Sequence, residues 1–258
     1  HIQMSRYMSA ADEALREVVA HVMHPPKKIQ QRFYARDDRS MVNKMFFSEF
    51  NRSPERATFP ILGFEAQPKV RAGEAPATVG EANPELRAKE AIGVVASSYE
   101  PIEMRFRRFV APISGKYRIK FNAHSVWVGP GEGKNWFRPN LDVVSKGKRS
   151  EPITFYAESP LRQVRYLKSF EFGVEPTERE MEIYLNKGEF IRWDASRLFR
   201  SRPPRYRNPL ATAEGQPGVA FKWMEVDGPI YDKWPRAGHK LLFGDLKMRR
   251  KNDKAPLE

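Results

Sequence analysis

The alternation of apolar and polar side chains in the second half of the chain most strongly limits what it can fold into. In residues 117–123 every second side chain is apolar, and residues 181–186 repeat the pattern. A period of two places successive side chains on opposite faces of a strand, so both segments predict strands with one buried face. The Asn186-Lys187-Gly188 turn then predicts a hairpin. Further strands are expected at 164–172, 190–193 and 219–226, and the whole pattern predicts a mainly β protein, an antiparallel β-sandwich.

The two ends of the chain depart from this pattern. Residues 3–22, within a predicted N-terminal unit of residues 1–24, carry apolar side chains at helical spacing and predict one clear helix, which Pro25 and Pro26 end. The helix has one apolar side, so it must pack against the rest of the chain or against a neighbouring module. Residues 231–258 lose periodicity and hold eight basic and four acidic residues, which predicts a basic exit linker.

Residues 25–100 are predicted to be a loop-rich, extended segment that packs on a sandwich formed by residues 101–230. Prolines recur there every six to eight residues between positions 54 and 84. An irregular stretch of this length is unusual in a compact domain, so we expect its aromatic side chains to hold it on the surface. Short strands are expected at 32–34, 58–64 and 92–95, with a helical turn near 85–89.

The composition removes several classes of protein. The 258 residues include no cysteine, which excludes disulfide frameworks, thiolate zinc sites, iron–sulfur clusters, covalently attached c-type haem and cysteine nucleophiles. No apolar run approaches the length of a membrane-spanning helix, so none is predicted. The hydrophobic share of 40% is enough for one large domain or for one domain with appendages.

The positive charge is concentrated in the second half of the chain. There are 45 Lys and Arg against 32 Asp and Glu, a formal net charge of +13, yet residues 1–100 hold 14 basic and 13 acidic side chains. Guanidinium groups bind phosphates, acidic sugars or acidic partners in bidentate fashion. The alternative is a solvated loop whose arginines pair with nearby carboxylates. The predicted anion or partner patch is the densest basic cluster, Arg197, Arg200, Arg202, Arg205 and Arg207.

No residue is predicted to be catalytic, so the chain is not expected to be an enzyme by itself. The sequence lacks Gly-x-Ser-x-Gly, a P-loop and a dinucleotide fingerprint, and no two carboxylates stand out as a glycosidase pair. His21 and His24 have a spacing that suits two metal ligands, but no third ligand is recognisable, and packing at the helix end is the ordinary explanation. The glycine-rich run 129–133 leaves Ca²⁺ open as a cofactor, because it offers backbone oxygen ligands.

Aromatic residues interleaved with polar ones form the strongest candidate site. Trp127, Trp136, Phe137 and Tyr156 fall within thirty residues. A sugar ring has apolar C–H faces and a hydroxyl rim, which an exposed aromatic ring beside amide, carboxylate and guanidinium groups suits. Because aromatic residues in a sandwich usually form the core, we expect about half of the four to be buried. The predicted carbohydrate-binding residues are His124, Trp127, Trp136, Phe137, Arg138, Asn140, Asp142 and Tyr156.

Several long motifs resemble one bacterial family. They include Glu90-Ala-Ile-Gly-Val-Val-Ala-Ser-Ser-Tyr-Glu-Pro-Ile-Glu103 and Glu225-Val-Asp-Gly-Pro-Ile-Tyr-Asp-Lys-Trp-Pro235, together with residues 109–118, 198–204, 208–212 and 215–221. This region is similar to the middle of large planctomycete-type multidomain proteins, in which domains of unknown function accompany a c-type cytochrome domain. Residues 4–15 resemble the tail of a preceding domain, and residues 238–245 resemble the lead-in to the next.

The resemblance implies a jelly-roll-like carbohydrate-binding module in an extracytoplasmic protein. It also implies flanking domains of a longer parent, among them a cytochrome domain as partner. This chain departs from the cytochrome part of the family because it has no Cys-x-x-Cys-His.

Three functions follow as hypotheses from the sequence. The first is a non-catalytic carbohydrate-binding β-sandwich module, linked to polysaccharide use by a larger protein. The alternative is a structural or assembly module that docks neighbouring domains or a redox partner. Nucleic-acid binding rests on the sequence pI near 9.9 alone and ranks last, because no nucleic-acid-binding motif is present.

Overall fold

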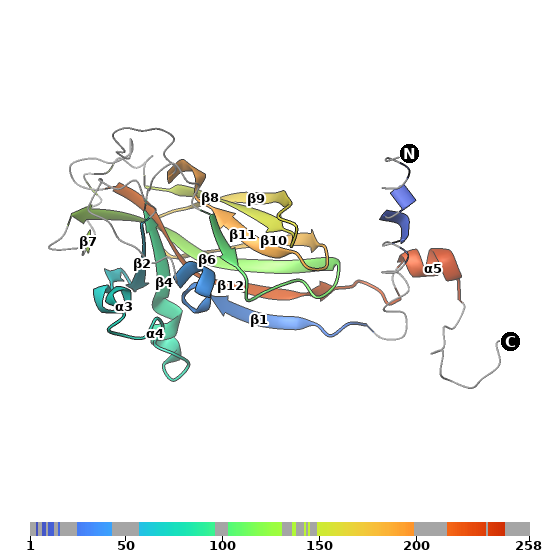
Figure 1. Cartoon of the computed structure of the whole chain (residues 1–258), viewed down its shortest axis with the longest axis horizontal. Helices are drawn as coiled ribbons and strands as arrows, with labels where there is room; N and C mark the ends of the chain where they lie inside the picture. Colours follow the sequence, from blue (N-terminus) through green and yellow to red (C-terminus); the bar gives the residue numbers. More distant parts are fainter. Residues whose placement is uncertain are drawn as a thin grey trace.

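The chain forms two antiparallel β-sheets stacked as a sandwich (Figure 1). The computed structural model describes residues 4, 7, 8, 10–12, 15, 25–42, 57–95, 103–130, 136, 137, 142, 144, 149–198, 216–235 and 237–245. The predicted fold class, a mainly β protein with an antiparallel β-sandwich, is confirmed. In the predicted N-terminal helix, all seven described residues between 4 and 15 are helical and exposed.

Among the described residues the larger sheet has eight strands, in the order β10-β6-β12-β4-β2-β3, with β1 paired to β12 and β7 paired to β6. Its strands are β1 (Ile29–Tyr34), β2 (Ala57–Leu62), β3 (Glu65–Ala66), β4 (Glu90–Val95), β6 (Gly115–Pro130), β7 (Trp136–Phe137), β10 (Thr177–Leu185) and β12 (Gln216–Ile230).

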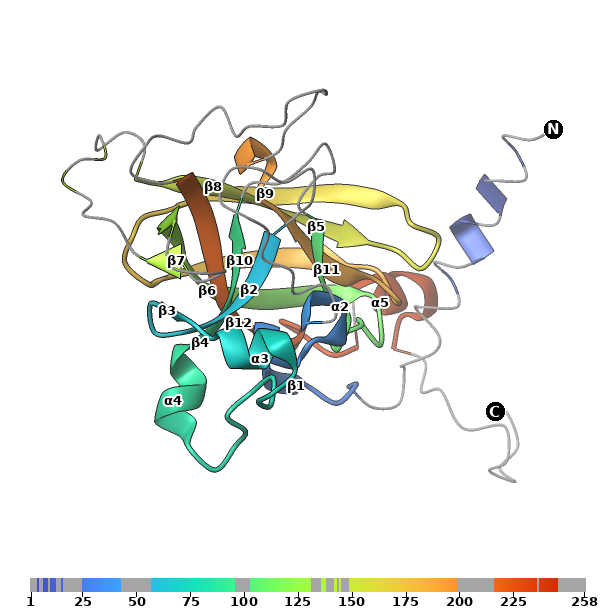
Figure 2. The same ribbon diagram turned by 60° about the vertical axis from the view of Figure 1, so that its left-hand side comes forward.

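The smaller sheet lies against one face of the larger one (Figure 2). Its described strands are β5 (Glu103–Phe106), β8 (Glu151–Glu158), β9 (Val164–Phe172) and β11 (Phe190–Asp194), in the order β5-β11-β8-β9. The short helices are η1 (Ala35–Asp37), α2 (Arg39–Val42), α3 (Pro68–Ala72), α4 (Pro84–Lys89), η4 (Ser196–Leu198) and α5 (Ala237–Phe243).

Aromatic side chains from both sheets fill the space between them. Phe121 of β6 stacks on Phe155 of β8 with ring centroids 4.0 Å apart, and Trp193 of β11 stacks on Phe221 of β12 at 4.8 Å. Burial of an apolar side chain of this size contributes about 1.5–3 kcal/mol, so the inward rows supply much of the driving force for folding. The alternation of apolar residues in β6 and β10 is what brings these rows onto one face.

Part of the larger sheet is buried on both faces. Every residue from Ala123 to Val128 of β6 is buried, although alternate side chains point to opposite faces. A second apolar cluster lies on the face away from the smaller sheet and includes Phe59, Ile61 and Val95. Gly93 allows it to close, because a Cβ atom there would lie 2.5 Å from Cε2 of Phe59.

Strand β12 changes partner along one edge, and a bulge marks the change. Residues 218–221 pair with β4, whereas residues 223–228 pair with β1. Against β6, Phe221 lies opposite Ala123 and Trp223 lies opposite Asn122, so Lys222 is the extra residue of a β-bulge. A bulge shifts the alternation by one position, and Trp223 therefore faces away from the smaller sheet.

The segment predicted to be loop-rich contributes strands to the sandwich itself. The strands expected at 32–34, 58–64 and 92–95 are present as β1, β2 and β4, and the helical turn near 85–89 is present as α4. These strands pair within the larger sheet, so the sandwich runs from residue 29 to residue 230 rather than beginning after residue 100. Of the predicted exit linker, residues 237–243 form α5, and residues 246–258 lie outside the described part.

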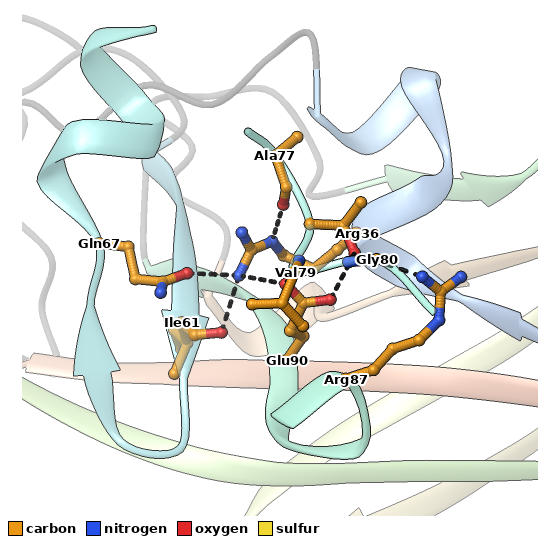
Figure 3. Close-up of polar contacts among 9 residues, drawn as sticks. Arg36, Ile61, Gln67, Ala77, Val79, Gly80, Arg87 and Glu90 are labelled. Carbon is orange, nitrogen blue, oxygen red and sulfur yellow. Dashed lines mark hydrogen bonds and ion pairs between the residues drawn. The ribbon is translucent and has the colours of Figure 1, made fainter. Parts of the chain in front are cut away.

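A buried ion pair ties the excursion between β2 and β4 to the end of β1 (Figure 3). The Arg36 guanidinium, 2% exposed, donates hydrogen bonds to the carbonyls of Ala77 and Ile61 and to Oε1 of Gln67, at 2.5, 3.1 and 2.6 Å. It lies 3.6 Å from the carboxylate of Glu90, which is fully buried. The Arg36 guanidinium thereby holds the segments before and after α3 against the larger sheet.

Candidate functional site

The predicted site residues on β6 lie in the interior. His124 is 0% exposed and Trp127 is 1% exposed. The His124 ring packs edge-on against Phe64, with centroids 5.5 Å apart. Direct contact of a sugar with either side chain would require its neighbours to move, and their assignment to a glycan site stays a prediction.

The remaining predicted residues of this region are only partly described. Trp136 and Phe137 form β7, which pairs with Pro130 and Gly129 at the end of β6. Arg138 and Asn140 lie outside the described residues. Asp142 is exposed, and its carboxylate is 4.0 Å from the guanidinium of Arg149. Most of the glycine-rich run 129–133 proposed for Ca²⁺ also lies outside the described part.

Tyr156 lies apart from these residues, on the outer face of the smaller sheet. In β8 the inward positions are Ile153, Phe155 and Ala157, which are fully buried, so alternation turns Tyr156 and Glu158 to the opposite face. A register shift between Phe155 and Tyr156 in the β8–β9 ladder then sets Tyr156 opposite Tyr166.

A continuous row of four side-chain positions crosses this face. Tyr166 on β9 is paired with Tyr156 on β8, which is paired with Arg192 on β11, which is paired with Arg105 on β5. Since partners across a ladder project on the same side, two aromatic rings and two guanidinium groups stand side by side. We call this row the Tyr–Arg row.

The two rings and one guanidinium contact each other directly. The Tyr156 and Tyr166 rings meet edge to face, with centroids 6.2 Å apart. The Arg192 guanidinium carbon is 5.2 Å from the centroid of Tyr156, a cation–π distance. Tyr166 is 61% exposed, so its ring is open to a ligand from solvent.

Two carboxylates hold the arginines in place. Nε of Arg105 donates a 2.8 Å hydrogen bond to Oε2 of Glu158, which is 2% exposed, and Arg192 lies 3.9 Å from the same carboxylate. Arg192 also lies 4.0 Å from Asp194. Burial and the charge of Asp194 raise the pKa of Tyr156, so its phenol remains protonated and able to donate a hydrogen bond further into the alkaline range than an ordinary tyrosine.

This arrangement can bind a ligand that has both an apolar face and a hydroxyl rim. The Tyr166 ring supplies a stacking surface, the phenol groups donate and accept hydrogen bonds, and the guanidinium groups donate them. The neighbouring row adds hydroxyls, because Oγ1 of Thr154 lies 2.8 Å from Oγ of Ser169. Sequence reasoning found Tyr156 but missed Tyr166, Arg192 and Arg105, because the pairing of strands brings them together.

The predicted arginine patch is described at one position only. Arg197 donates to the carboxylate of Glu151 from Nε at 2.9 Å and from Nη2 at 2.5 Å. Burial raises the pKa of Glu151, and the hydrogen bond and charge of Arg197 oppose that rise. Arg197 thus follows the alternative in which these arginines pair with carboxylates. Arg200, Arg202, Arg205 and Arg207 lie outside the described residues.

Two further features of the described residues bear on function. No three of their His, Asp or Glu side chains are grouped closely enough to form a metal site. None of the helices in the described part has the length and apolar character needed to cross a membrane.

The fold and the Tyr–Arg row together define a class of protein, an antiparallel β-sandwich whose smaller sheet carries aromatic and polar side chains on its outer face. Neither a protein-family profile nor a curated protein sequence matches the chain. Solved structures that overlap it include a family 35 carbohydrate-binding module from Clostridium thermocellum, at 10% identity over 77% of this chain and 98% of the module, with a TM-score of 0.32.

Two further neighbours also carry carbohydrate names. A mutant family 29 carbohydrate-binding module complexed with mannohexaose overlaps at 6% identity over 77% of this chain and 92% of the module, with a TM-score of 0.31. The Arthrobacter globiformis T6 isomalto-dextranase complexed with panose overlaps at 11% identity over 79% of this chain and 24% of the enzyme, with a TM-score of 0.30. Scores of this size reflect partial overlap of strands, so function is inferred from this chain's own surface.

Proposed function

We propose that the chain is a non-catalytic carbohydrate-binding module that contacts a glycan with the outer face of its smaller sheet. The observation that carries the proposal is the Tyr–Arg row, in which an exposed Tyr166 ring stands beside Tyr156 and two guanidinium groups. The predicted residues Trp136, Phe137, Arg138, Asn140 and Asp142 are proposed as further glycan contacts outside the Tyr–Arg row.

The expected affinity follows from the kinds of contact. A ring stacked on an aromatic face contributes about 0.5–1.5 kcal/mol beyond its buried area, and each net hydrogen bond contributes about the same. Two rings and a few hydrogen bonds, set against the cost of immobilising the sugar, predict weak binding at a single site. Binding of this strength suits a module that works in concert with other domains.

The parent protein is proposed to be extracytoplasmic and to carry flanking domains, including a cytochrome domain. Support for this part comes from the sequence motifs at 90–103 and 225–235 and their resemblance to planctomycete-type multidomain proteins. A module that holds a polysaccharide would keep the other domains close to it.

Substitution of Tyr166 tests the proposed face. Affinity electrophoresis of the chain through gels that contain glucomannan, xylan or dextran should show retardation by at least one polysaccharide, and Tyr166→Ala should remove most of it. Tyr7→Ala is the matched control, because Tyr7 is 73% exposed but lies in the N-terminal helical segment. If Tyr166→Ala and Tyr7→Ala migrate as the unmodified chain does, the Tyr–Arg row is not the binding face.

A second candidate function, docking of neighbouring domains, is favoured by exposed apolar side chains in the helical segments. Met4 and Met8 are 67% and 66% exposed, and Leu241 of α5 is 86% exposed. A contiguous exposed apolar patch marks an interface, and Met4 and Met8, four residues apart in a helical segment, lie on the same side of it. Co-purification of the chain with a flanking domain, and its loss in Met8→Glu with Leu241→Glu, would favour docking over a free-standing module.

A further inference from the structure

The larger sheet carries a groove on its own outer face, remote from the Tyr–Arg row. The groove has a volume of about 410 Å³ and crosses four strands, β1, β12, β6 and β10. It lies within the size range of small-ligand sites. Its lining residues are Gln30, Gln31, Arg32, Arg118, Lys120, Glu180, Glu225, Val226 and Asp227.

Strand register sets the charges of the groove in two rows. In the first row Arg32 pairs with Glu225, Glu225 with Lys120, and Lys120 with Glu180. The sign of the charge therefore alternates from strand to strand.

The second row crosses the strands in the same order and lies two residues away from the first row on each strand. Gln30 pairs with Asp227, Asp227 with Arg118, and Arg118 with Glu182. Each cationic side chain on β6 thus stands between carboxylates on both sides.

Ion pairs fix the orientation of these side chains. The Arg32 guanidinium contacts Oε2 of Glu225 through Nε at 3.1 Å and Nη2 at 2.8 Å. Arg118 contacts Glu182 at 2.8 Å and Glu180 at 3.4 Å. Because the groups are already held by each other, a ligand meets an ordered array of donors and acceptors.

The charge of the lining selects the class of ligand. Three cationic side chains are matched by three carboxylates, so the lining is neutral although the chain carries +13. A polyanion would have to displace carboxylates from their cations and would meet Glu180, Glu225 and Asp227 as like charges. A neutral polyhydroxyl ligand needs no such displacement, because each hydroxyl can donate to a carboxylate while it accepts from a guanidinium or amide.

We propose that this groove is a second glycan-binding site, which takes a neutral oligosaccharide segment by hydrogen bonding rather than by stacking. The inference rests on the proposed function for the class of ligand but uses residues of the other sheet. A module with a site on each sheet can hold two chains, or two parts of one chain, and so gains avidity on a polysaccharide.

Calorimetric titration with manno-, xylo- and cello-hexaose tests the groove, with polygalacturonate as the anionic probe. The variant Lys120→Ala/Glu225→Ala removes one cation and one carboxylate and keeps the lining neutral. Lys116→Ala is its control, since Lys116 lies on β6 outside the lining. We expect two hexaoses per chain, one of which is lost or weakened about tenfold in the groove variant, the change for about 1.4 kcal/mol of lost contact. Lys116→Ala should keep both sites.

The outcomes separate this inference from the proposed function. If one hexaose binds and Tyr166→Ala abolishes it while the groove variant leaves it unchanged, the groove is not a site and the proposed face stands. If the groove variant abolishes binding and Tyr166→Ala does not, the groove is the site and the proposed face is wrong. Binding of polygalacturonate alone, weakening as salt rises, overturns the neutral-ligand inference. No binding of any probe overturns both.

Discussion

The buried pair of Arg36 and Glu90 gives a sharp test of what holds the sandwich together. In Arg36→Met a side chain of similar length replaces the guanidinium, so the main loss is charge and hydrogen bonds rather than volume. The Glu90 carboxylate, fully buried, would lose the cation 3.6 Å away. The carbonyls of Ala77 and Ile61 would lose a donor.

The expected cost is large compared with the stability of a domain. Removal of one partner of a buried pair costs about 3–5 kcal/mol, because the remaining charge stays desolvated. The Glu90 carboxylate keeps the hydroxyl of Thr78 and the amide of Val79 as donors, each at 2.7 Å, so we place the loss near the middle, at about 4 kcal/mol. A domain has about 5–15 kcal/mol in all, and the variant should unfold at much lower urea.

Two further variants distinguish the ion pair from simple loss of packing. Arg36→Met with Glu90→Gln removes both charges but keeps an acceptor for Val79, so it should be more stable than Arg36→Met alone, by about 2 kcal/mol. Arg32→Met is the control, because the pair of Arg32 with Glu225 is more than a third exposed on both sides, and exposed pairs contribute about 0–1 kcal/mol. Urea unfolding followed by tryptophan fluorescence measures all four chains. A loss in Arg36→Met no greater than that in Arg32→Met would refute the reasoning.

Two other variants test the packing and the electrostatics of the sandwich. Gly93→Ala should destabilise the fold by about 1–3 kcal/mol, because the new Cβ atom would lie 2.5 Å from the Phe59 ring. Urea unfolding measures the loss, and an unchanged midpoint would show that the ring can shift freely. Arg197→Ala should lower stability near neutral pH, and the deficit should shrink as the pH falls toward the usual carboxyl range. Burial raises the pKa of Glu151 even with Arg197 present, and loss of Arg197 raises it further, so on acidification the folded variant takes up the proton before the unmodified protein does and recovers stability. Unfolding curves of both chains across pH check this, and a deficit that grows on acidification would contradict it.

Local patterns predicted most of the longer strands because alternation reports burial directly, but the strands at 103–106 and 151–158 were not predicted. The expected strands at 117–123 and 181–186 lie within β6 and β10, and even the proline-rich segment gave β2 and β4 near their true positions. What local patterns could not give is membership of a sheet. Residues 25–95 look irregular because their strands are short and separated by turns, yet they pair with the centre of the larger sheet.

The candidate site was only partly predictable, for the same reason. Tyr156 was recognisable as one of four aromatic residues close together in the sequence, but no strand was predicted at 151–158, and its partner Tyr166 depends on a register shift in the β8–β9 ladder. For residues 123–128 of β6 the sequence did not reveal burial on both faces. Aromatic and polar residues there suggest a ligand surface, whereas the second apolar cluster buries that end of the strand on both faces.

The β-bulge at Lys222 changes which positions of β12 face the core. Before it, Val219 and Phe221 face the core, and after it Met224 and Val226 do, so odd positions exchange roles with even ones. Without the bulge, regular alternation through the same residues would turn Trp223 and Glu225 inward and Met224 and Val226 to water. The position of Glu225 and Asp227 in the groove therefore depends on the β-bulge as well as on the residues of the strand, and a pairing of β12 without the bulge would remove both carboxylates from the groove although the sequence stayed the same.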